Sequence, residues 1–196
     1  MGINLQKGQK IDLTKDSAGL QHIMVGLGWD EASHSGGLFG RFKKPKSIDC
    51  DAAAIICGPN GKFRNLVYYA NLGLKNGSVI HQGDNLTGEG DGDDEQIMLD
   101  LKKLSSDVSK IVFVVNIYNA SEKQQHFGML ENAFIRLYDM DKNSEICRFN
   151  LSDNYYGMEG LVVGEIYKKE NQWRFNAIGQ PVETASHIED LVVMYK

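Results

Sequence analysis

The sequence has little of what disulfide frameworks, fibrous chains or membrane spans require. Its 196 residues include three prolines and three cysteines. The longest strongly apolar run, residues 111–115, is far shorter than the roughly 20 residues of a membrane helix. The start, MGINLQKGQKIDL, lacks the charged and then apolar pattern of a secretory leader. We therefore expect a cytoplasmic protein without a membrane span.

The cysteines and histidines also lack the spacings typical of metal sites and catalytic motifs. Cys50, Cys57 and Cys147 lie in apolar stretches and never in CxxC spacing, so we expect buried, reduced thiols rather than disulfides or a cysteine-based zinc site. The histidines show no HxxxH or HExxH spacing, and no GxSxG sequence occurs. The patterns of zinc hydrolases and serine hydrolases are therefore absent.

One segment of the chain has no basic residue at all. Residues 84–95 (DNLTGEGDGDDE) carry six acidic side chains, which leaves 20 of the chain's 26 acids against all 21 of its bases. This short loop therefore holds the whole negative excess behind the net charge of −5. A nucleic-acid binder needs a basic face, and the charge balance argues against one.

What is present are short apolar or alternating runs, separated by turn residues about every ten positions, as in β-sandwiches and barrels. The expected strands are 21–29, 48–57, 62–70, 77–82, 97–101, 110–118, 133–140, 145–151, 159–168 and 172–179. The Asn60-Gly61 dipeptide predicts a tight hairpin, and residues 141–144 and 169–171 predict two more. Largely antiparallel pairing follows.

Helical signals are few. Residues 121–130 could form a short helix, and Thr184 could N-cap a terminal helix through Met194. No linker or repeat divides the chain. We therefore predict a single domain over residues 1–196, an all-β protein whose β-sandwich consists of two mainly antiparallel sheets with a few short helices.

The acidic loop has the chemistry of a cation site. Crowded carboxylates repel one another by about 1 kcal/mol per close pair even in water, while carboxylates, Asn85, Thr87 and flexible glycines supply hard oxygen ligands. Calcium accepts six to eight such oxygens in adaptable geometry, whereas magnesium demands an octahedron. The loop does not match the EF-hand spacing. A solvated loop without metal is the alternative.

Two other segments place carboxylates where they could join this loop. Asp49 and Asp51 stand at i and i+2 on an expected strand, so both side chains emerge on one face. Asp30 follows Trp29 at the end of another expected strand. In a sandwich, such strand ends can converge on one loop.

Four motifs together resemble the TerD family of tellurium-resistance and stress-response proteins. They are GDNLTGEGDGDDEQI at 83–97, IDCDAAA at 48–54, GLGWD at 26–30 and GEIYKKENQWRFNAIGQ at 164–180. The resemblance implies a β-sandwich that binds calcium, usually two ions, through an acidic cluster at one end. It implies that the protein has no enzymatic activity. It also implies that its partners are other tellurium-resistance proteins, which can include membrane-associated ones.

The resemblance also transfers a set of metal-site residues by motif position. They are Asp30, Asp49, Asp51, Asp84, Asn85, Asp91, Asp93, Asp94 and Glu95. We expect calcium to order the 84–95 loop and thereby create a surface for a protein partner. Two segments depart from the family pattern: a glycine-rich basic stretch at 31–47, and the C-terminal PVETASHIEDLVVMYK.

Two rival functions remain open at this stage. A metal-dependent phosphoesterase could use the same carboxylates around two ions, although the acidic motifs contain no Lys, Arg or His to stabilise a developing charge. A metal-free interaction sandwich is the second rival. It predicts no change in stability on adding calcium.

Overall fold

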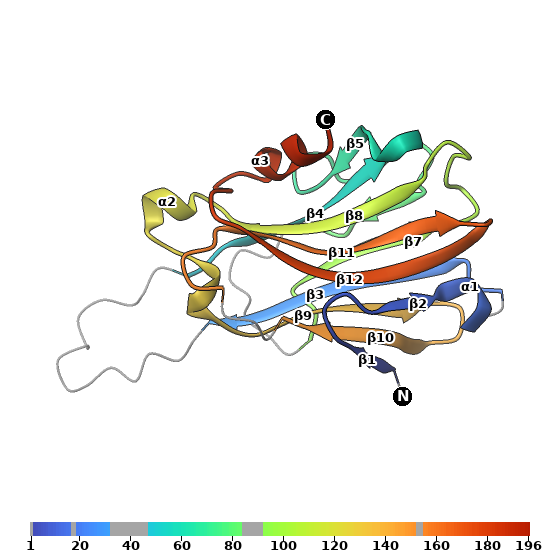
Figure 1. The fold of residues 1–196 in the computed structure, drawn as a ribbon, viewed down its shortest axis with the longest axis horizontal. Coiled ribbons are helices and arrows are strands. Elements are labelled where there is room, and N and C mark those ends of the chain that lie inside the picture. The colour runs from blue at the N-terminus through green and yellow to red at the C-terminus, as the bar shows by residue number, and fades with distance from the viewer. Residues whose placement is uncertain (1, 17–18, 32–46, 84–91, 152–154) are drawn as a thin grey trace.

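The computed structural model describes residues 2–16, 19–31, 47–83, 92–151 and 155–196. Its strands form two six-stranded sheets that pack face to face (Figure 1). The prediction of an all-β sandwich with few short helices is confirmed.

Each sheet combines strands from both ends of the chain. In spatial order, sheet A contains β1 (Ile3–Leu5), β10 (Ser144–Asn150), β9 (Leu130–Asp139), β3 (His22–Glu31), β7 (Glu95–Asp100) and β6 (Val79–His81). Sheet B contains β2 (Lys10–Asp12), β12 (Gln172–Val182), β11 (Gly160–Lys169), β8 (Lys110–Ile117), β4 (Cys50–Cys57) and β5 (Phe63–Val67).

The core forms two apolar layers, because some strands are buried on both faces. In β4, Cys50, Ala52 and Ala54 belong to the cluster between the sheets. The alternate residues Ala53, Ile55 and Cys57 belong to a second cluster, which includes residues of the C-terminal helix α3 (Ile188–Val192). This helix lies on the outer face of sheet B (Figure 1). Both faces of β4 are therefore covered, unlike those of a simple solvent-facing sheet.

All ten expected strands are present, and the three expected hairpins pair antiparallel as β4–β5, β9–β10 and β11–β12. Their turns use left-handed backbone at Asn60 (φ 62°), Asn143 (φ 51°) and Asn171 (φ 62°). Asparagine tolerates this conformation better than most residues, which is why these turns were predictable.

Three elements at the N-terminus were not predicted. These are β1, β2 and the short helix α1 (Leu13–Asp16). The two strands have three residues each, too few for a periodic pattern. β1 is also the exception to antiparallel pairing, since it lies parallel to β10.

The predicted helices need correction. Residues 121–130 do not form one helix but a four-residue turn of helix, α2 (Ala120–Lys123), and a 3₁₀ turn, η2 (Phe127–Met129). Gln124 takes a left-handed conformation (φ 55°) and ends α2. At the C-terminus, His187 rather than Thr184 caps α3, and its backbone N–H donates to Asp190 Oδ2 at 3.0 Å. A 3₁₀ turn, η3 (Val193–Tyr195), follows α3.

The three cysteines are buried and reduced, as predicted. Burial raises the pKa of the Cys57 thiol, and it raises the pKa of Cys147 to about 12. Thiolates are the reactive form of cysteine, so these side chains are poor nucleophiles.

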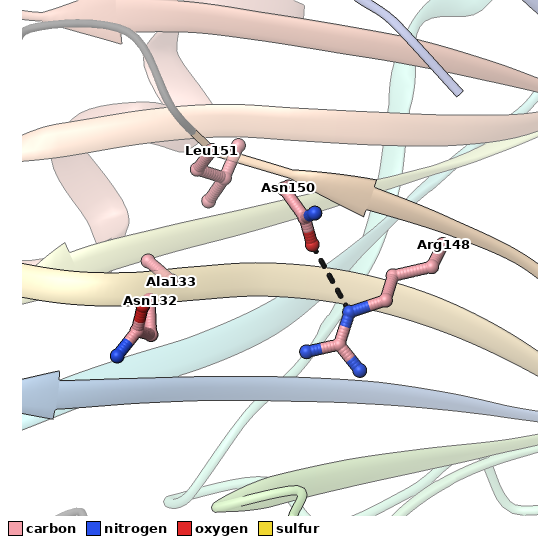
Figure 2. Close-up of a pocket in the computed structure, with 5 residues that line it drawn as sticks. All are labelled: Asn132, Ala133, Arg148, Asn150 and Leu151. Atoms are coloured by element: carbon pink, nitrogen blue, oxygen red, sulfur yellow. Dashed lines mark hydrogen bonds between the residues drawn. The ribbon is translucent and has the colours of Figure 1, made fainter. Parts of the chain in front are cut away.

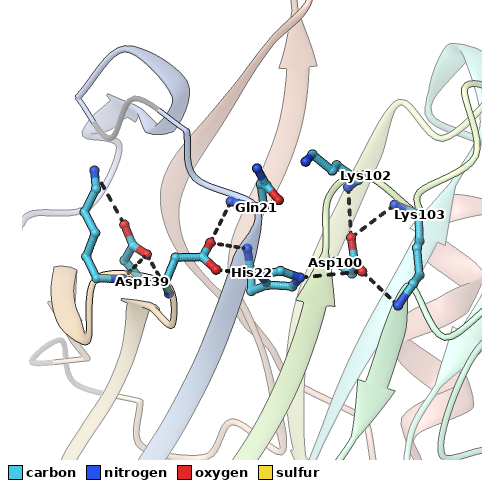
Figure 3. Close-up of polar contacts among 8 residues, drawn as sticks. Gln21, His22, Asp100, Lys102, Lys103 and Asp139 are labelled. Carbon is cyan, nitrogen blue, oxygen red and sulfur yellow. Dashed lines mark hydrogen bonds and ion pairs between the residues drawn. The ribbon is translucent and has the colours of Figure 1, made fainter.

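A polar cluster at the start of β3 joins three segments of sheet A (Figure 3). His22 Nδ1 lies 2.7 Å from Asp141 Oδ1 in the β9–β10 turn, and Asp141 Oδ2 accepts the backbone N–H groups of Gln21 and His22 at 3.1 Å each. His22 Nε2 lies 3.7 Å from Asp100 Oδ2, which Lys103 Nζ approaches to 2.9 Å. The cluster ties the ends of three strands together.

Two hydrogen bonds from His22 lower the pKa of Asp141 below its ordinary value. The bond from the His22 side chain has the larger effect, and the bond from its backbone N–H has the next largest. A depressed carboxyl pKa contributes stability above the unfolded value of about 3.9, and this is lost as the pH falls through the folded pKa. We expect Asp141→Asn to lower the urea midpoint at neutral pH. The difference from wild type should shrink as the pH falls below about 5 and should close as the pH falls through the lowered pKa of Asp141.

Glu183→Gln is the matched control, since it removes an exposed carboxylate for which the described residues offer no hydrogen bond or ion pair. If the urea midpoints of Asp141→Asn and wild type differed by the same amount across the acid range, the lowered pKa of Asp141 would not contribute to stability as proposed.

Candidate metal site

The structure describes six of the nine predicted metal-site residues. Asp30, Asp49, Asp51, Asp93, Asp94 and Glu95 are among them. Asp84, Asn85 and Asp91 lie outside the described residues, as does most of the basic segment 31–47. The six come from the end of β3, the start of β4 and the start of β7.

Asp49 and Asp51 flank the first residue of β4. Asp51 is 4% exposed. Lys123 Nζ of α2 lies 3.8 Å from Asp49 Oδ2 and 5.2 Å from the ring centroid of Tyr118. The two aspartates alternate with Ile48 and Cys50 of the core, so the prediction that their side chains share one face of the strand is confirmed.

Glu95 connects the two sheets through the backbone of Ala52. β5 pairs with β4 only from Ala54 onward, which leaves the edge at Ala52 without a strand partner. Glu95 Oε2 accepts the Ala52 N–H at 2.6 Å, and His81 Nε2 lies 3.2 Å from the Ala52 carbonyl oxygen. The side chains of Glu95 and His81 are both 0% exposed and 3.4 Å apart. Together they replace a neighbouring strand at this edge.

The hydrogen bonds of His81 fix its tautomer. The Gly83 backbone N–H donates to His81 Nδ1 at 3.1 Å, so Nδ1 carries no proton. Nε2 therefore keeps the proton and donates it toward the Ala52 carbonyl and Glu95. Gly83 precedes the acidic segment, so His81 anchors the start of that segment as Glu95 anchors its end.

Asp93 is held by an arginine on the outer face of sheet A. Arg136 Nε donates to Asp93 Oδ1 at 2.7 Å, and its Nη2 donates to Oδ2 at 2.8 Å. The Asp93 side chain is 0% exposed. It lies over Gly26, where an added Cβ would come within 2.3 Å of the carboxylate. Each Asp93 oxygen accepts one N–H from Arg136, so the arginine occupies the bidentate face of this carboxylate.

Asp94 and Asp30 meet at the end of β3. Asp94 Oδ2 accepts the Trp29 N–H at 2.8 Å, and Asp30 Oδ2 accepts Asn132 Nδ2 at 2.8 Å. Burial raises the pKa of Asp94, the Trp29 hydrogen bond opposes it, and the charges of Asp30 and Asp93 raise it further. These carboxylates therefore destabilise one another's charged forms.

Carboxylates of the 49–51 segment and of the 94–95 segment all act on the Cys50 thiol. Burial raises the pKa of the Cys50 thiol well above its ordinary value, and four negative charges add to this effect. In order of strength they belong to Glu95, Asp51, Asp49 and Asp94. Segments 48–51 and 94–95 therefore lie within electrostatic reach of Cys50, and the hydrogen bond from the Ala52 N–H to Glu95 joins the strand that contains Asp51 to the 94–95 segment.

Three residues near these carboxylates carried no role in the sequence analysis. His81 and Arg136 hold Glu95 and Asp93, and Asn116 of β8 pairs in register with Asp51. Asn116 is 0% exposed, and neither atom of its side-chain amide finds a hydrogen-bond partner in the described residues. The available signal was a lone Asn inside the apolar strand VFVVNIY. A buried amide without partners is rare and costly.

Within the described ranges, no three His, Cys, Asp or Glu side chains gather closely enough to hold a metal by themselves. In the same ranges, no helix has the length and apolar character to cross a bilayer.

Comparison with known proteins identifies relatives along the whole chain. A model of the TerD domain matches residues 1–195. The chain is 48% identical over 200 residues to stress response protein SCP2 of Bacillus subtilis (strain 168), covering 100% of both. It is 39% identical over 183 residues to tellurium resistance protein TerD of Serratia marcescens, covering 92% of this chain and 91% of that protein.

A solved structure supports the same architecture. A homologue of telluride resistance protein (TerD) from Streptomyces coelicolor A3(2) superposes with a TM-score of 0.63 at 17% identity. The match covers 85% of this chain and 92% of the other. At this identity the similarity concerns the fold.

Proposed function

Because the chain belongs to the TerD domain family, we propose that it is a calcium-binding, non-enzymatic module of a stress response that includes tellurium resistance. Relatives named for stress response and for tellurium resistance support the physiological role. The hydrogen bond from the Ala52 N–H to Glu95 Oε2, which joins the segment of Asp94 and Glu95 to the strand of Asp49 and Asp51, supports the calcium part of the proposal.

The donor set fits calcium in kind. Carboxylate oxygens dominate it, and the amide of Asn116 beside Asp51 adds a neutral oxygen of the type calcium accepts. Asp49, Asp51 and Asp94 would hold the ion with residues of the 84–91 segment. Glu95, fixed by Ala52 and His81, would orient the end of that segment.

A bound calcium would supply positive charge and a coordination shell, and no chemical step is assigned to it. The structure adds two cationic or proton-carrying groups near the acids, His81 and Arg136, which a phosphoesterase could use. Both ring nitrogens of His81 are engaged in a fully buried contact, and Arg136 is bound bidentate to Asp93. No observation therefore favours the hydrolase alternative.

We further propose that the calcium-loaded acidic end acts as a docking surface in the cytoplasm. Partners would include other tellurium-resistance proteins, several of which are relatives of this chain. His81 holds Gly83, just before the 84–95 segment, and Ala52 holds Glu95 at its end, so a cation bound between these two points could set the shape of the surface.

Calorimetric titration of chelator-treated protein tests the metal proposal. We expect saturable heat with calcium, much weaker heat with magnesium, and loss of the calcium heat in Asp49→Asn/Asp51→Asn. Asp107→Asn/Glu183→Gln removes the same formal charge from exposed positions and should bind like wild type. Absence of calcium heat from folded wild-type protein would overturn the proposal.

A further inference from the structure

A polar pocket opens on sheet A beside the metal-site end. It has a volume of about 430 Å³ and is lined by Asn132, Ala133, Arg148, Asn150 and Leu151 (Figure 2). These residues come from the start of β9 and the end of β10, with Leu151 just beyond. Among the described residues that line it, the polar groups are one guanidinium and two side-chain amides, with no carboxylate.

Arg148 is held in a fixed orientation at this pocket. Its guanidinium carbon lies 3.5 Å from the ring centroid of Phe134, and its Nε donates to Asn150 Oδ1 at 3.0 Å. Figure 2 shows the two terminal nitrogens on the side of the guanidinium away from Asn150. Stacking and one hydrogen bond thus orient the planar group and leave its terminal N–H donors available.

Arg148 differs from the other arginines that the structure describes. Arg64 pairs with Asp107, Arg136 with Asp93 and Glu145, and Arg174 with Asp12. Arg148 has no ion pair with any described residue, although it is half-buried and cross-strand from Arg136. A partly desolvated cation without a counter-charge favours binding of an anion.

Two side-chain amides lie beside the guanidinium at this pocket. Asn150 directs its oxygen to Arg148, and its side-chain nitrogen makes no hydrogen bond within the described ranges. Asn132 adopts a left-handed backbone (φ 53°), and its side-chain nitrogen is committed to Asp30. The two terminal guanidinium nitrogens of Arg148 form one fork that suits two oxygens of a single group, and Asn150 holds the guanidinium from its other side.

We propose that this pocket binds a small oxyanion through the two terminal nitrogens of Arg148, which Asn150 and Phe134 hold in place. The shared chemistry is a group with at least two oxygens that can accept a parallel pair of N–H donors, as in a carboxylate or an inorganic oxyanion. Phe134 positions Arg148 through the stacked ring and is not itself a ligand. The site does not depend on calcium binding, because none of its donors is a predicted metal ligand.

The test uses the full-length ¹⁵N-labelled protein in chelator at constant ionic strength, with chloride as the replaced anion. Sodium sulfate, sodium acetate and sodium tellurite are titrated separately, and the Arg148 Nε–Hε and Asn150 Nδ2 resonances are followed. We expect saturable shifts of both. A response confined to acetate identifies a carboxylate ligand, and one to sulfate or tellurite an inorganic oxyanion; either supports the site.

Variants separate fork recognition from simple charge. Arg148→Lys keeps the charge and should weaken binding by about tenfold or more, since a charge-assisted hydrogen bond in a fixed fork is lost. Phe134→Leu should weaken it less. Arg64→Lys, on the other sheet and exposed, is the matched control and should bind like wild type. Resonances that do not respond to any of the three anions, or equal weakening by Arg64→Lys, would overturn the proposal.

The outcome is independent of the calcium titration. Anion binding without calcium heat would support the pocket and overturn the proposed metal function. Calcium heat without anion binding would support the metal function and overturn the pocket. Repeating the acetate titration in calcium then measures any coupling through the Asn132–Asp30 hydrogen bond.

Discussion

Saturating calcium is expected to raise the midpoint of thermal unfolding by about 8–16 °C. At a free concentration about 1,000 times the dissociation constant, one ion that binds only the folded protein adds about 4 kcal/mol. For a chain of this length, each kcal/mol corresponds to about 2–4 °C. The folded arrangement is the one that binds, because segments 48–51 and 94–95 come together only through the packing of the two sheets.

The measurement is a thermal melt followed by circular dichroism, in chelator and across a calcium series. Asp49→Asn/Asp51→Asn should melt close to, or above, chelated wild type and should not respond to calcium, since two of the repelling charges are gone. Magnesium at the same concentration is the control for general screening of charge. A calcium response no larger than that of magnesium would leave the acidic segment as a charged surface only.

Arg136→Met is expected to lower the free energy of unfolding by about 3–5 kcal/mol, because it leaves the carboxylate of Asp93 buried without its partner. Asp93 is 0% exposed, and both of its oxygens accept from Arg136. Asp93→Asn should cost less, since the neutral amide needs no counter-charge and Arg136 still has Glu145 at 3.6 Å. The double variant should recover part of the loss in a urea-unfolding cycle.

Arg174→Met is the matched control for this cycle. Arg174 has a similar exposure, 28% against 26% for Arg136, but its partner Asp12 is 16% exposed and the contact is 3.5 Å. We expect a loss of about 1 kcal/mol or less at this more hydrated pair. Equal losses for the two arginines would show that burial of Asp93 contributes little.

The double variant also decides the role of Asp93. If Asp93 anchors the end of the acidic segment, Asp93→Asn/Arg136→Met should retain calcium heat while its fold is weakened. If Asp93 is a ligand, calcium heat should fall in Asp93→Asn even where the protein is fully folded. The two readouts are independent, so instability cannot be mistaken for loss of ligation.

The sandwich was predictable because its signals are local. A strand such as β8, with five consecutive apolar residues, and turns such as Asn60-Gly61 act within a few positions of the chain. β1 and β2 were missed because three residues carry no period, and their stability comes from pairing with β10 and β12. The short helix expected within 121–130 covers only Ala120–Lys123, because Gln124 takes a left-handed conformation that the local sequence does not signal.

The candidate site also has a part that could be predicted from the sequence and a part that could not. The shared face of Asp49 and Asp51 follows from their spacing along one strand, so the sequence was sufficient. The partners Arg136 and His81 depend on sheet register, since β9 places Arg136 opposite Gly26 and β6 places His81 opposite Ile97. The sequence pattern does not show which residues lie opposite one another on neighbouring strands. It therefore could not show whether Asp93 binds a cation or is held by Arg136 instead.

The pairing of β1 and β2 has a consequence for synthesis of the protein. Ile3 lies beside Cys147, and Lys10 lies beside Asn176. On the ribosome, the first twelve residues therefore remain without their partners until nearly the whole chain has emerged. Contacts so distant in sequence slow folding, because the chain must close a long loop before it gains the pairing. β1 and β2 keep unpaired backbone groups for that time, which makes them the segments of the nascent chain most exposed to wrong strand partners.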